Sequence, residues 1–193
     1  MLSYEESLKI LKETKALIDG HFILSSGLHS PQYVQCAQLL SKPERSSIIC
    51  KSLAKKIKLA FGKFDLILSP AMGGLIIGYE IGRLLGIETI FAERVEKKFV
   101  LRRDFKIHKN QKVLIVEDVI TTGKSSLECT DLIYKAGATL VGFSCIIDRS
   151  RKKSVLKKKI ISQIELNIPT YSSDDLPKNL SLIKAVKPGS RNL

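Results

Sequence analysis

Two adjacent carboxylates follow an aliphatic run in the middle of this 193-residue chain. The run is Val113 to Val116, and its β-branched and aliphatic residues are typical of a strand covered on both faces. Glu117 and Asp118 come directly after it. Ligands of open α/β sheets bind outside the carboxyl ends of the strands, where paired carboxylates can accept hydrogen bonds from vicinal hydroxyl groups. The pair therefore indicates a sugar site.

A turn of small and hydroxyl-bearing residues leads from the acid pair towards a predicted helix at 125–136. Backbone N–H groups at such a helix start, together with the helix dipole, favour an anion. Acids for a sugar and donors for a phosphate are thus only a few residues apart. The alternative is a plain solvated loop. The turn consists of Thr121, Thr122, Gly123, Lys124 and Ser125.

The same turn shares Gly123, Lys124 and Ser125 with the ATP-binding P-loop motif. That motif requires a second glycine five residues before Gly123, because both glycines shape the phosphate-binding loop. Asp118 occupies this position. The spacing therefore excludes a P-loop.

Residues 116–125, Val-Glu-Asp-Val-Ile-Thr-Thr-Gly-Lys-Ser, resemble the phosphoribosyl pyrophosphate (PRPP) signature of the type I phosphoribosyltransferases. The resemblance implies that Glu117 and Asp118 hold the ribose hydroxyls, with Asp118 also a catalytic candidate. It implies Mg²⁺ bound mainly through PRPP, with no metal ligand assigned directly to the protein. It also implies a homodimer with shared active sites. The 5′-phosphate would be wrapped by the stretch from Val119 to Ser126, which includes Ile120 and has Thr121, Thr122, Gly123, Lys124 and Ser125 at its centre.

A second predicted strand, 66–69, also ends in a small-residue turn before a helix. The family resemblance implies that this turn contacts pyrophosphate. The alternative is a tight turn that needs glycine for its backbone alone. Gly73 stands where the family often has a lysine, so that contact does not carry over. The candidate pyrophosphate residues are Ala71, Met72, Gly73 and Gly74.

The segment 91–107 occupies the place of the mobile catalytic loop of this family. Arg94 matches the family arginine that reaches pyrophosphate. Beyond Arg94 the sequence departs from the better-known branch, and we expect a hairpin through 101–104. We expect Lys97 or Lys98 to supply the cation that covers the leaving pyrophosphate, ahead of Arg102 or Arg103.

Residues 20–35 resemble the entry segment of orotate phosphoribosyltransferases. A planar carboxylated pyrimidine suits the chemistry of this segment, because Phe22 and Tyr33 can form apolar walls and the stretch from Ser25 to Gly27 offers donors for a carboxylate. Ordinary core packing is the alternative for both rings. Ser25 stands where the family often has a lysine. The candidate orotate residues here are Phe22, Ser25, Ser26, Gly27 and Tyr33, with Thr121 added from the phosphate turn.

Asp148-Arg149 follows a predicted strand at 140–147 and matches an Asp-Arg pair whose arginine meets orotate in this family. A guanidinium suits a carboxylate or a pyrimidine carbonyl. The alternative is that Arg149 is merely the first charge of a basic loop. The tail 187–191 resembles one bacterial branch of these enzymes, so the resemblance covers nearly the whole chain.

The remaining pattern predicts an α/β fold with a mostly parallel sheet flanked by helices. Helices are expected at 3–18, 43–61, 75–85 and 125–136, and strands at 66–69, 89–92, 113–116 and 140–147. The length suits one phosphoribosyltransferase domain over residues 1–193. The resemblance adds a small hood formed by about 1–40 and 165–193.

Composition and charge narrow the function classes. The net charge of +13 suits anionic substrates, and without a nucleic-acid-binding motif it does not favour nucleic acid. The chain has no apolar run of membrane-spanning length and no secretory signal, so a cytoplasmic protein is expected. Its four scattered cysteines favour buried or free thiols over disulfides or zinc. The leading hypothesis is transfer of phosphoribosyl to orotate in pyrimidine synthesis. The alternatives are transfer to another base and a non-catalytic regulator on the same fold.

Overall fold

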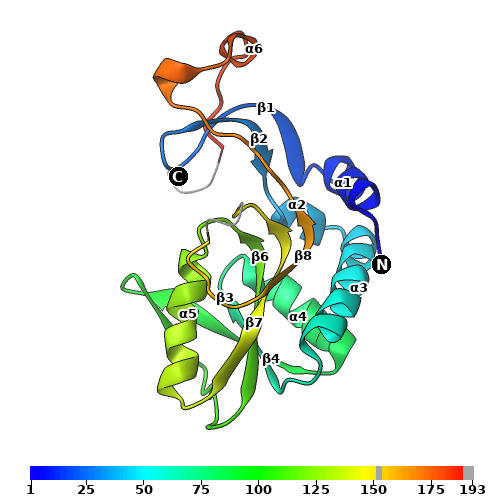
Figure 1. The fold of residues 1–193 in the computed structure, drawn as a ribbon, viewed down its shortest axis with the longest axis vertical. Helices are drawn as coiled ribbons and strands as arrows, with labels where there is room; N and C mark the ends of the chain where they lie inside the picture. Colours follow the sequence, from blue (N-terminus) through cyan, green and yellow to red (C-terminus); the bar gives the residue numbers. More distant parts are fainter. Residues whose placement is uncertain (151–153, 189–193) are drawn as a thin grey trace.

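A mostly parallel sheet forms the centre of the molecule (Figure 1). The computed structural model describes residues 1–150 and 154–188. Across the sheet the strand order is β5-β4-β3-β6-β7-β8, and only β5 runs antiparallel to its neighbour. The predicted α/β fold is confirmed. The strands are β3 (Leu66–Pro70), β4 (Glu88–Val95), β5 (Lys98–Leu101), β6 (Lys112–Ile120), β7 (Thr139–Asp148) and β8 (Ile160–Glu165).

Helices cover both faces of this sheet, which explains the unbroken apolar strands. Successive residues of a strand point to opposite faces. Thus Leu66 and Leu68 pack with Ile133 of α5, whereas Ile67 packs with Ile49 of α3. No helix in the described part of the chain combines the length and apolar composition needed to cross a membrane. The helices are α1 (Tyr4–Glu13), α2 (Ala37–Leu40), α3 (Pro43–Phe61), α4 (Gly74–Leu85), α5 (Lys124–Lys135), the 3₁₀ turn η1 (Ser173–Asp175) and α6 (Lys178–Ser181).

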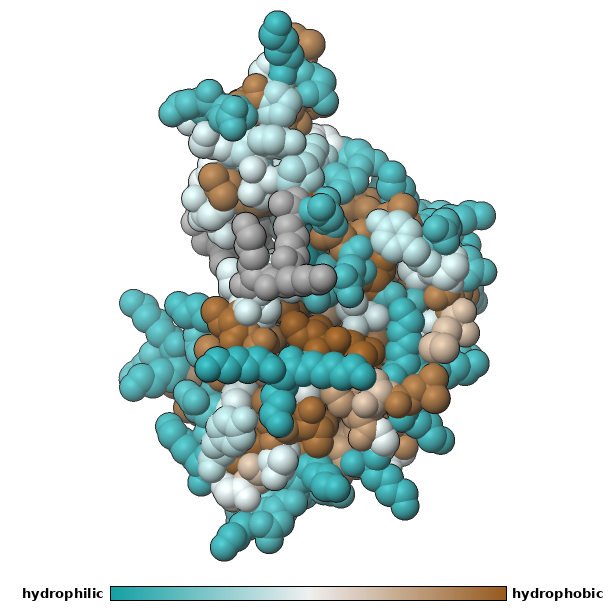
Figure 2. Space-filling model, in the orientation of Figure 1, coloured by the Kyte–Doolittle hydropathy of each residue, from teal (hydrophilic) through white to brown (hydrophobic). Residues whose placement is uncertain are grey.

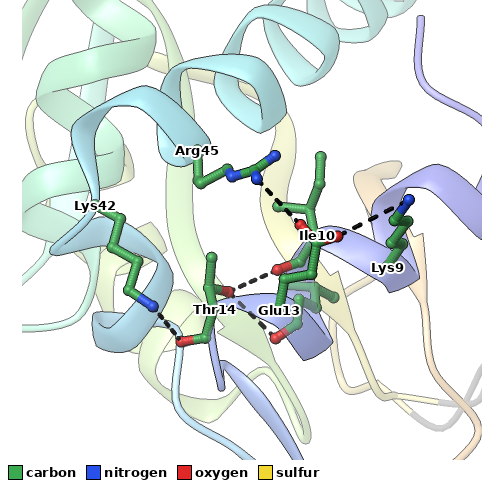
Figure 3. A network of polar contacts seen from close by, with 7 residues as sticks. Lys9, Ile10, Glu13, Thr14, Lys42 and Arg45 are labelled. Carbon is green, nitrogen blue, oxygen red and sulfur yellow. Dashed lines mark hydrogen bonds and ion pairs between the residues drawn. The ribbon is translucent and has the colours of Figure 1, made fainter.

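The first helix ends earlier than the predicted 3–18, so the expectation for its last turn is wrong. After Glu13 the chain leaves the helix: Lys15 adopts a left-handed φ of 58°. The Thr14 hydroxyl donates to the Ile10 carbonyl at 2.8 Å, a local bond that competes with helix continuation (Figure 3). Lys42 donates to the Thr14 carbonyl at 3.4 Å and ties this end to the turn before α3. The apolar residues near Ile18 therefore begin a strand instead.

A hood stands beyond the edge of the sheet at which β6 and β7 end (Figure 1). It contains the antiparallel pair β1 (Leu17–Ile23) and β2 (His29–Val34). The C-terminal segment joins this pair, because Ile23 N–H donates to the Val186 carbonyl and His29 N–H donates to the Tyr171 carbonyl. The hood is thus built from both parts of the chain that the family resemblance implied. Residues 189–191 of the predicted tail lie outside the described residues.

A tight hairpin occupies the place expected for a mobile catalytic loop. Its turn is Glu96-Lys97, with φ of 46° and 68°, and it pairs Val95 with Lys98. Two successive positive φ values match the twist of the flanking strands. The hairpin expected through 101–104 is therefore misplaced, because pairing of β4 with β5 starts earlier and buries Phe99.

Candidate active site

The acid pair at the end of β6 is divided between the two faces of the sheet. Val113 and Ile115 face α5, and Glu117 continues this row. The Ser126 hydroxyl at the start of α5 donates to Glu117 Oε2. Asp118 lies on the other face, where its main-chain carbonyl is 3.9 Å from Cys36 Sγ. The two carboxylates therefore approach a ligand at the strand end from two directions.

Asp118 touches the second predicted turn, the one after β3. A Cβ atom added to Gly73 would lie only 2.7 Å from Asp118 Oδ1, closer than real Cβ contacts. Only glycine therefore fits at this position without moving the carboxylate. This close approach brings the candidate pyrophosphate turn and the candidate ribose acid into direct contact.

Both carboxyl groups are held in an environment that opposes their charge. Burial, together with the neighbouring Asp118 charge, raises the pKa of Glu117 to about 7, although the Ser126 hydrogen bond acts in the lowering direction. Burial also raises the pKa of Asp118, against the lowering effect of the Val119 N–H, which donates to Oδ1 at 2.9 Å. Ligand hydroxyls would supply the hydrogen bonds that favour the charged forms.

The predicted phosphate turn leads into α5 as expected. Gly123 precedes the helix with φ of 79° and has no side chain to cap it, while the Lys124 N–H donates to Thr122 Oγ1 at 3.3 Å. The N–H groups that follow Lys124 in the first turn have no partner within the helix and are candidates for binding an anion. Behind the turn lies a segment that the sequence did not reveal: Val155 N–H donates to the Thr122 carbonyl at 3.1 Å, and a Cβ at Gly123 would meet Leu156 at 2.7 Å. Thr121, Thr122 and Lys124 are exposed, Ser125 and Val119 are partly exposed, and Ile120 is buried.

Arg94 lies at the carboxyl end of β4 and is already engaged. Its Nη1 is 2.8 Å from Glu128 Oε2 and donates to the Lys97 carbonyl at 2.5 Å. The guanidinium also lies 4.1 Å from the centre of the Phe99 ring. Glu128 was not predicted, because its pairing with Arg94 joins two elements that are distant in sequence.

The other candidate cations fall into two groups. Arg102 and Arg103 are both paired with Glu93, at 3.8 and 2.8 Å. Lys97 and Lys98 are exposed at the tip of the hairpin, and neither forms an ion pair within residues 1–150 and 154–188. The lysines are therefore freer to meet a new anion.

The candidate base residues are divided between the hood and the sheet. In the hood, the Phe22 and Tyr33 rings pack against each other with centroids 5.6 Å apart, and Phe22 is buried. Ser25, Ser26 and Gly27 form an exposed turn between β1 and β2, where Gly27 has φ of 81°. Arg149 belongs to the sheet edge: its N–H donates to the Ile120 carbonyl at 2.8 Å. Arg149 is thus next to the phosphate turn.

A cavity of about 600 Å³ lies beside the ends of β7 and β8. Its lining includes Asp148 and Ser150 on either side of Arg149, and Ser154 and Leu156 from behind the phosphate turn. Figure 2 shows apolar residues on this face of the molecule below the hood, bordered by hydrophilic side chains. A cavity of about 610 Å³ lies at the opposite end of the sheet, between α3 and α4. Neither cavity is lined by the acid pair.

Comparison with known proteins gives a consistent family relationship. A family profile described as the phosphoribosyl transferase domain matches residues 35–174. The orotate phosphoribosyltransferase of Parvibaculum lavamentivorans is 46% identical over 193 residues, and that of Maricaulis maris is 42% identical over 193 residues. Both alignments cover 100% of this chain and 100% of the relative.

Solved structures share the fold at lower identity. The orotate phosphoribosyltransferase of Aeropyrum pernix has a TM-score of 0.72 at 23% identity, covering 82% of this chain and 92% of that chain. The adenine phosphoribosyltransferase of Thermoanaerobacter pseudethanolicus has a TM-score of 0.61 at 20% identity, covering 70% and 88%. The fold alone therefore does not select the base.

Proposed function

The chain belongs to the orotate phosphoribosyltransferase family, and we propose that it transfers the 5-phosphoribosyl group from PRPP to orotate. The products are orotidine 5′-monophosphate and pyrophosphate, in the synthesis of pyrimidine nucleotides. The full-length relatives support orotate, and the observation that carries the PRPP part of the proposal is the close approach of Gly73 to Asp118. It joins the turn suited to pyrophosphate to the acid suited to ribose, and these two groups are adjacent in PRPP.

The reaction is displacement of pyrophosphate at the anomeric carbon by a ring nitrogen of orotate, through an oxocarbenium-like transition state. Glu117 and Asp118 accept hydrogen bonds from the ribose hydroxyls, and N–H groups of the turn 121–125 hold the 5′-phosphate. Arg149 and the turn 25–27 meet orotate. The work of the protein is mainly to position two anions and to stabilise charge as it develops.

Charge on the departing pyrophosphate is met by cations from the β4–β5 hairpin. Arg94 provides a guanidinium beside the sheet edge, and Lys97 and Lys98 are the exposed ammonium groups at the tip. The turn from Ala71 to Gly74 contributes backbone N–H groups. This assignment keeps Lys97 and Lys98 ahead of Arg102 and Arg103, because both arginines already lie within ion-pair distance of Glu93.

Mg²⁺ enters the site mainly on the oxygens of PRPP. The fit is chemical: Mg²⁺ prefers oxygen ligands and usually reaches phosphate-transferring sites through substrate phosphates. Within the described residues, no group of three or more His, Cys, Asp or Glu side chains could hold a metal ion. When bound, Mg²⁺ neutralises negative charge on the leaving pyrophosphate.

The proposed enzyme works in the cytoplasm as a homodimer with shared active sites. An apolar surface on α4 offers a place for the second copy. Met72, Ile76 and Tyr79 are 80%, 55% and 67% exposed, and their spacing places them on one side of the helix and its leading turn. Exposed apolar patches often mark protein interfaces, and this one begins inside the pyrophosphate turn.

The reaction is tested by incubating the protein with PRPP, Mg²⁺ and orotate, uracil or adenine in separate assays, and measuring pyrophosphate release. We expect release with orotate alone. Asp118→Asn, tested in parallel, should lower the rate and so exclude a contaminating enzyme. Release with adenine or uracil but not orotate would support the second candidate, which is transfer to another base. This candidate is considered because an adenine phosphoribosyltransferase shares the fold. No release with any base would indicate a non-catalytic regulator.

A further inference from the structure

Ser126 lies in the first turn of α5 and is the last residue of the stretch predicted to wrap the phosphate. Its side chain is fully buried at 0% exposure. The hydroxyl donates to Glu117 Oε2, and the Ser126 carbonyl accepts from the Thr130 hydroxyl at 3.0 Å. Burial and the helix backbone therefore fix the hydroxyl in place. A buried serine could simply satisfy its own polarity through a main-chain carbonyl, but this one is bonded to a carboxylate of the acid pair.

Glu117 depends on that contact. In the described part of the chain, Ser126 supplies the side-chain hydrogen bond to the Glu117 carboxyl group, while burial and Asp118 both oppose its charge. One oxygen, Oε2, is committed to Ser126. The other is left for a ligand, and its direction is fixed because rotation of the carboxylate would break the bond to Ser126.

We propose that Ser126 is a positioning residue of the ribose site: it holds one oxygen of Glu117 so that the other accepts from a ribose hydroxyl. This inference rests on the proposed function for the identity of the sugar. Ser126 itself does not touch the substrate. It acts through Glu117 and links the start of α5, which holds the 5′-phosphate, to the ribose of the same molecule.

Removing the hydroxyl should have two effects with different pH dependence. The pKa of Glu117 should rise, because the Ser126 hydrogen bond that lowers it is lost. PRPP binding requires the ionised carboxylate, so as the pH is lowered the variant should lose affinity at a higher pH than the wild type does. The carboxylate should also lose its fixed orientation. Because Ser126 is bonded to Glu117 even without a ligand, its removal affects PRPP affinity only through the raised pKa and the lost orientation of Glu117. We expect a loss of affinity on the order of tenfold near pH 7. The gap between variant and wild type should narrow by pH 9, where Glu117 is ionised in both.

The experiment compares Ser126→Ala with wild type by calorimetric titration with PRPP and Mg²⁺ from pH 6 to 9. Ser144→Ala is the matched control: Ser144 is also 0% exposed, but its hydroxyl donates to the Ile161 carbonyl at 2.9 Å. Ser126→Thr, which keeps a hydroxyl, should restore much of the affinity. Thermal unfolding of each variant separates binding from folding.

The inference is upheld if Ser126→Ala alone weakens binding and shifts its pH dependence upward. Wild-type affinity and pH dependence in a folded Ser126→Ala protein would overturn it, as would an equal loss in Ser144→Ala. Orotate turnover by the wild type is measured on the same preparation. Because the titration needs no base, a protein that binds PRPP but does not use orotate would contradict the proposed function and leave the test of Ser126 intact.

Discussion

At the scale of single residues, the site is held in an unfavourable state that a ligand can relieve. Glu117 has a pKa of about 7, because burial opposes its charge. Its ordinary value is 4.5, so the folded protein binds this proton more tightly than the unfolded chain does. The stabilisation from the protonated form is fully present below pH 4.5 and is lost as the pH rises to about 7. At neutral pH the buried Glu117 carboxylate therefore lowers folding stability, as expected if its charge serves the proposed ribose site.

Glu117→Gln should accordingly stabilise the fold while reducing PRPP binding. Glutamine carries no charge, and its carbonyl can still accept from Ser126. We expect the free energy of unfolding to rise by up to roughly 3 kcal/mol at pH 8, the equivalent of the full pKa difference. Urea unfolding at pH 5 and pH 8 measures this. A variant less stable than wild type at pH 8 would mean that Glu117 is not held against its charge.

A substitution at Gly73 tests whether the close approach of the pyrophosphate turn to Asp118 matters for turnover. The Gly73 backbone is helical, with φ of −58°, so alanine is compatible with the backbone, but its Cβ would lie 2.7 Å from Asp118 Oδ1. Gly73→Ala should displace the carboxylate and reduce turnover on the order of 100-fold, as expected for a catalytic group misplaced by about 1 Å. Steady-state kinetics measures the loss.

Gly62→Ala is the control for Gly73→Ala. At Gly73 alanine fits the backbone but meets Asp118, whereas at Gly62 alanine strains the backbone but meets no neighbour. Gly62 has φ of 62°, and a Cβ added there would meet open space, so alanine strains the backbone without touching the site. It should lower the melting temperature and leave turnover near wild type. Normal kinetics in Gly73→Ala would show that Asp118 adjusts without cost.

The site residues that the sequence predicts are those whose type and spacing are visible within one short stretch of the chain. The acid pair and the turn around Gly123 are neighbours in the sequence, so one short stretch is enough to predict their chemistry. Ser126 was expected only as the last residue of the phosphate turn, and its bond to Glu117 was missed. Glu128 and the segment 154–156 were missed altogether, because their roles depend on contacts through space. No periodicity identifies which buried serine faces a carboxylate.

At the scale of elements, the β4–β5 hairpin carries the proposed leaving-group cations on a tight turn. Its turn is only Glu96-Lys97, and Arg94 pairs with Glu128 of α5. If Arg94 binds pyrophosphate, Glu128 competes for the same guanidinium. The strength of that competition is limited, since both side chains are partly exposed, at 39% and 29%.

Glu128→Gln should therefore tighten pyrophosphate binding by roughly threefold, the size expected from a partly exposed ion pair. Calorimetric titration with pyrophosphate and Mg²⁺ measures the change. Glu80→Gln is the control, because Glu80 pairs with Arg83 on α4 at a similar distance of 2.8 Å. Weaker binding in Glu128→Gln would mean that Glu128 presents Arg94 to the anion instead of competing for it.

The four inner strands of the central sheet were predictable from their patterns, whereas the edge strands β5 and β8 and the strands of the hood were not. Strands such as β6 and β7 are buried on both faces and therefore form long apolar runs. By contrast, β1 contains an irregular register between Asp19 and Phe22 and pairs with a polar partner strand. The strand β8 follows a lysine-rich stretch that hides its start. Such strands depend on partners that no local window contains.

At the scale of the whole molecule, the proposed site and an exposed apolar surface lie side by side at the carboxyl end of the parallel sheet. The carboxyl end bears the proposed site, and the apolar surface of Met72, Ile76 and Tyr79 adjoins it. If a second copy covers this surface, each subunit lies close to the pyrophosphate turn of the other. Assembly and catalysis would then depend on the same region.

Ile76→Lys should convert the proposed dimer to monomers, because it places a charge in the centre of the apolar surface. Light scattering coupled to size exclusion measures the mass, and orotate turnover should fall with it. Leu127→Lys is the control, since Leu127 is exposed to a similar degree, 43%, on α5. A monomeric wild type, or a dimeric Ile76→Lys protein, would contradict this interface.

The hood has a consequence for how the protein is made. Strands β1 and β2 emerge early from the ribosome, but their hydrogen-bond partners at Tyr171 and Val186 emerge much later. Until then β1 and β2 form only a two-stranded ribbon, which is marginally stable by itself. The strands of the central sheet, by contrast, are available sooner. We therefore expect a nascent chain to acquire its sugar-phosphate cradle first and its base-recognition half last, so that a prematurely released chain could bind PRPP without using it.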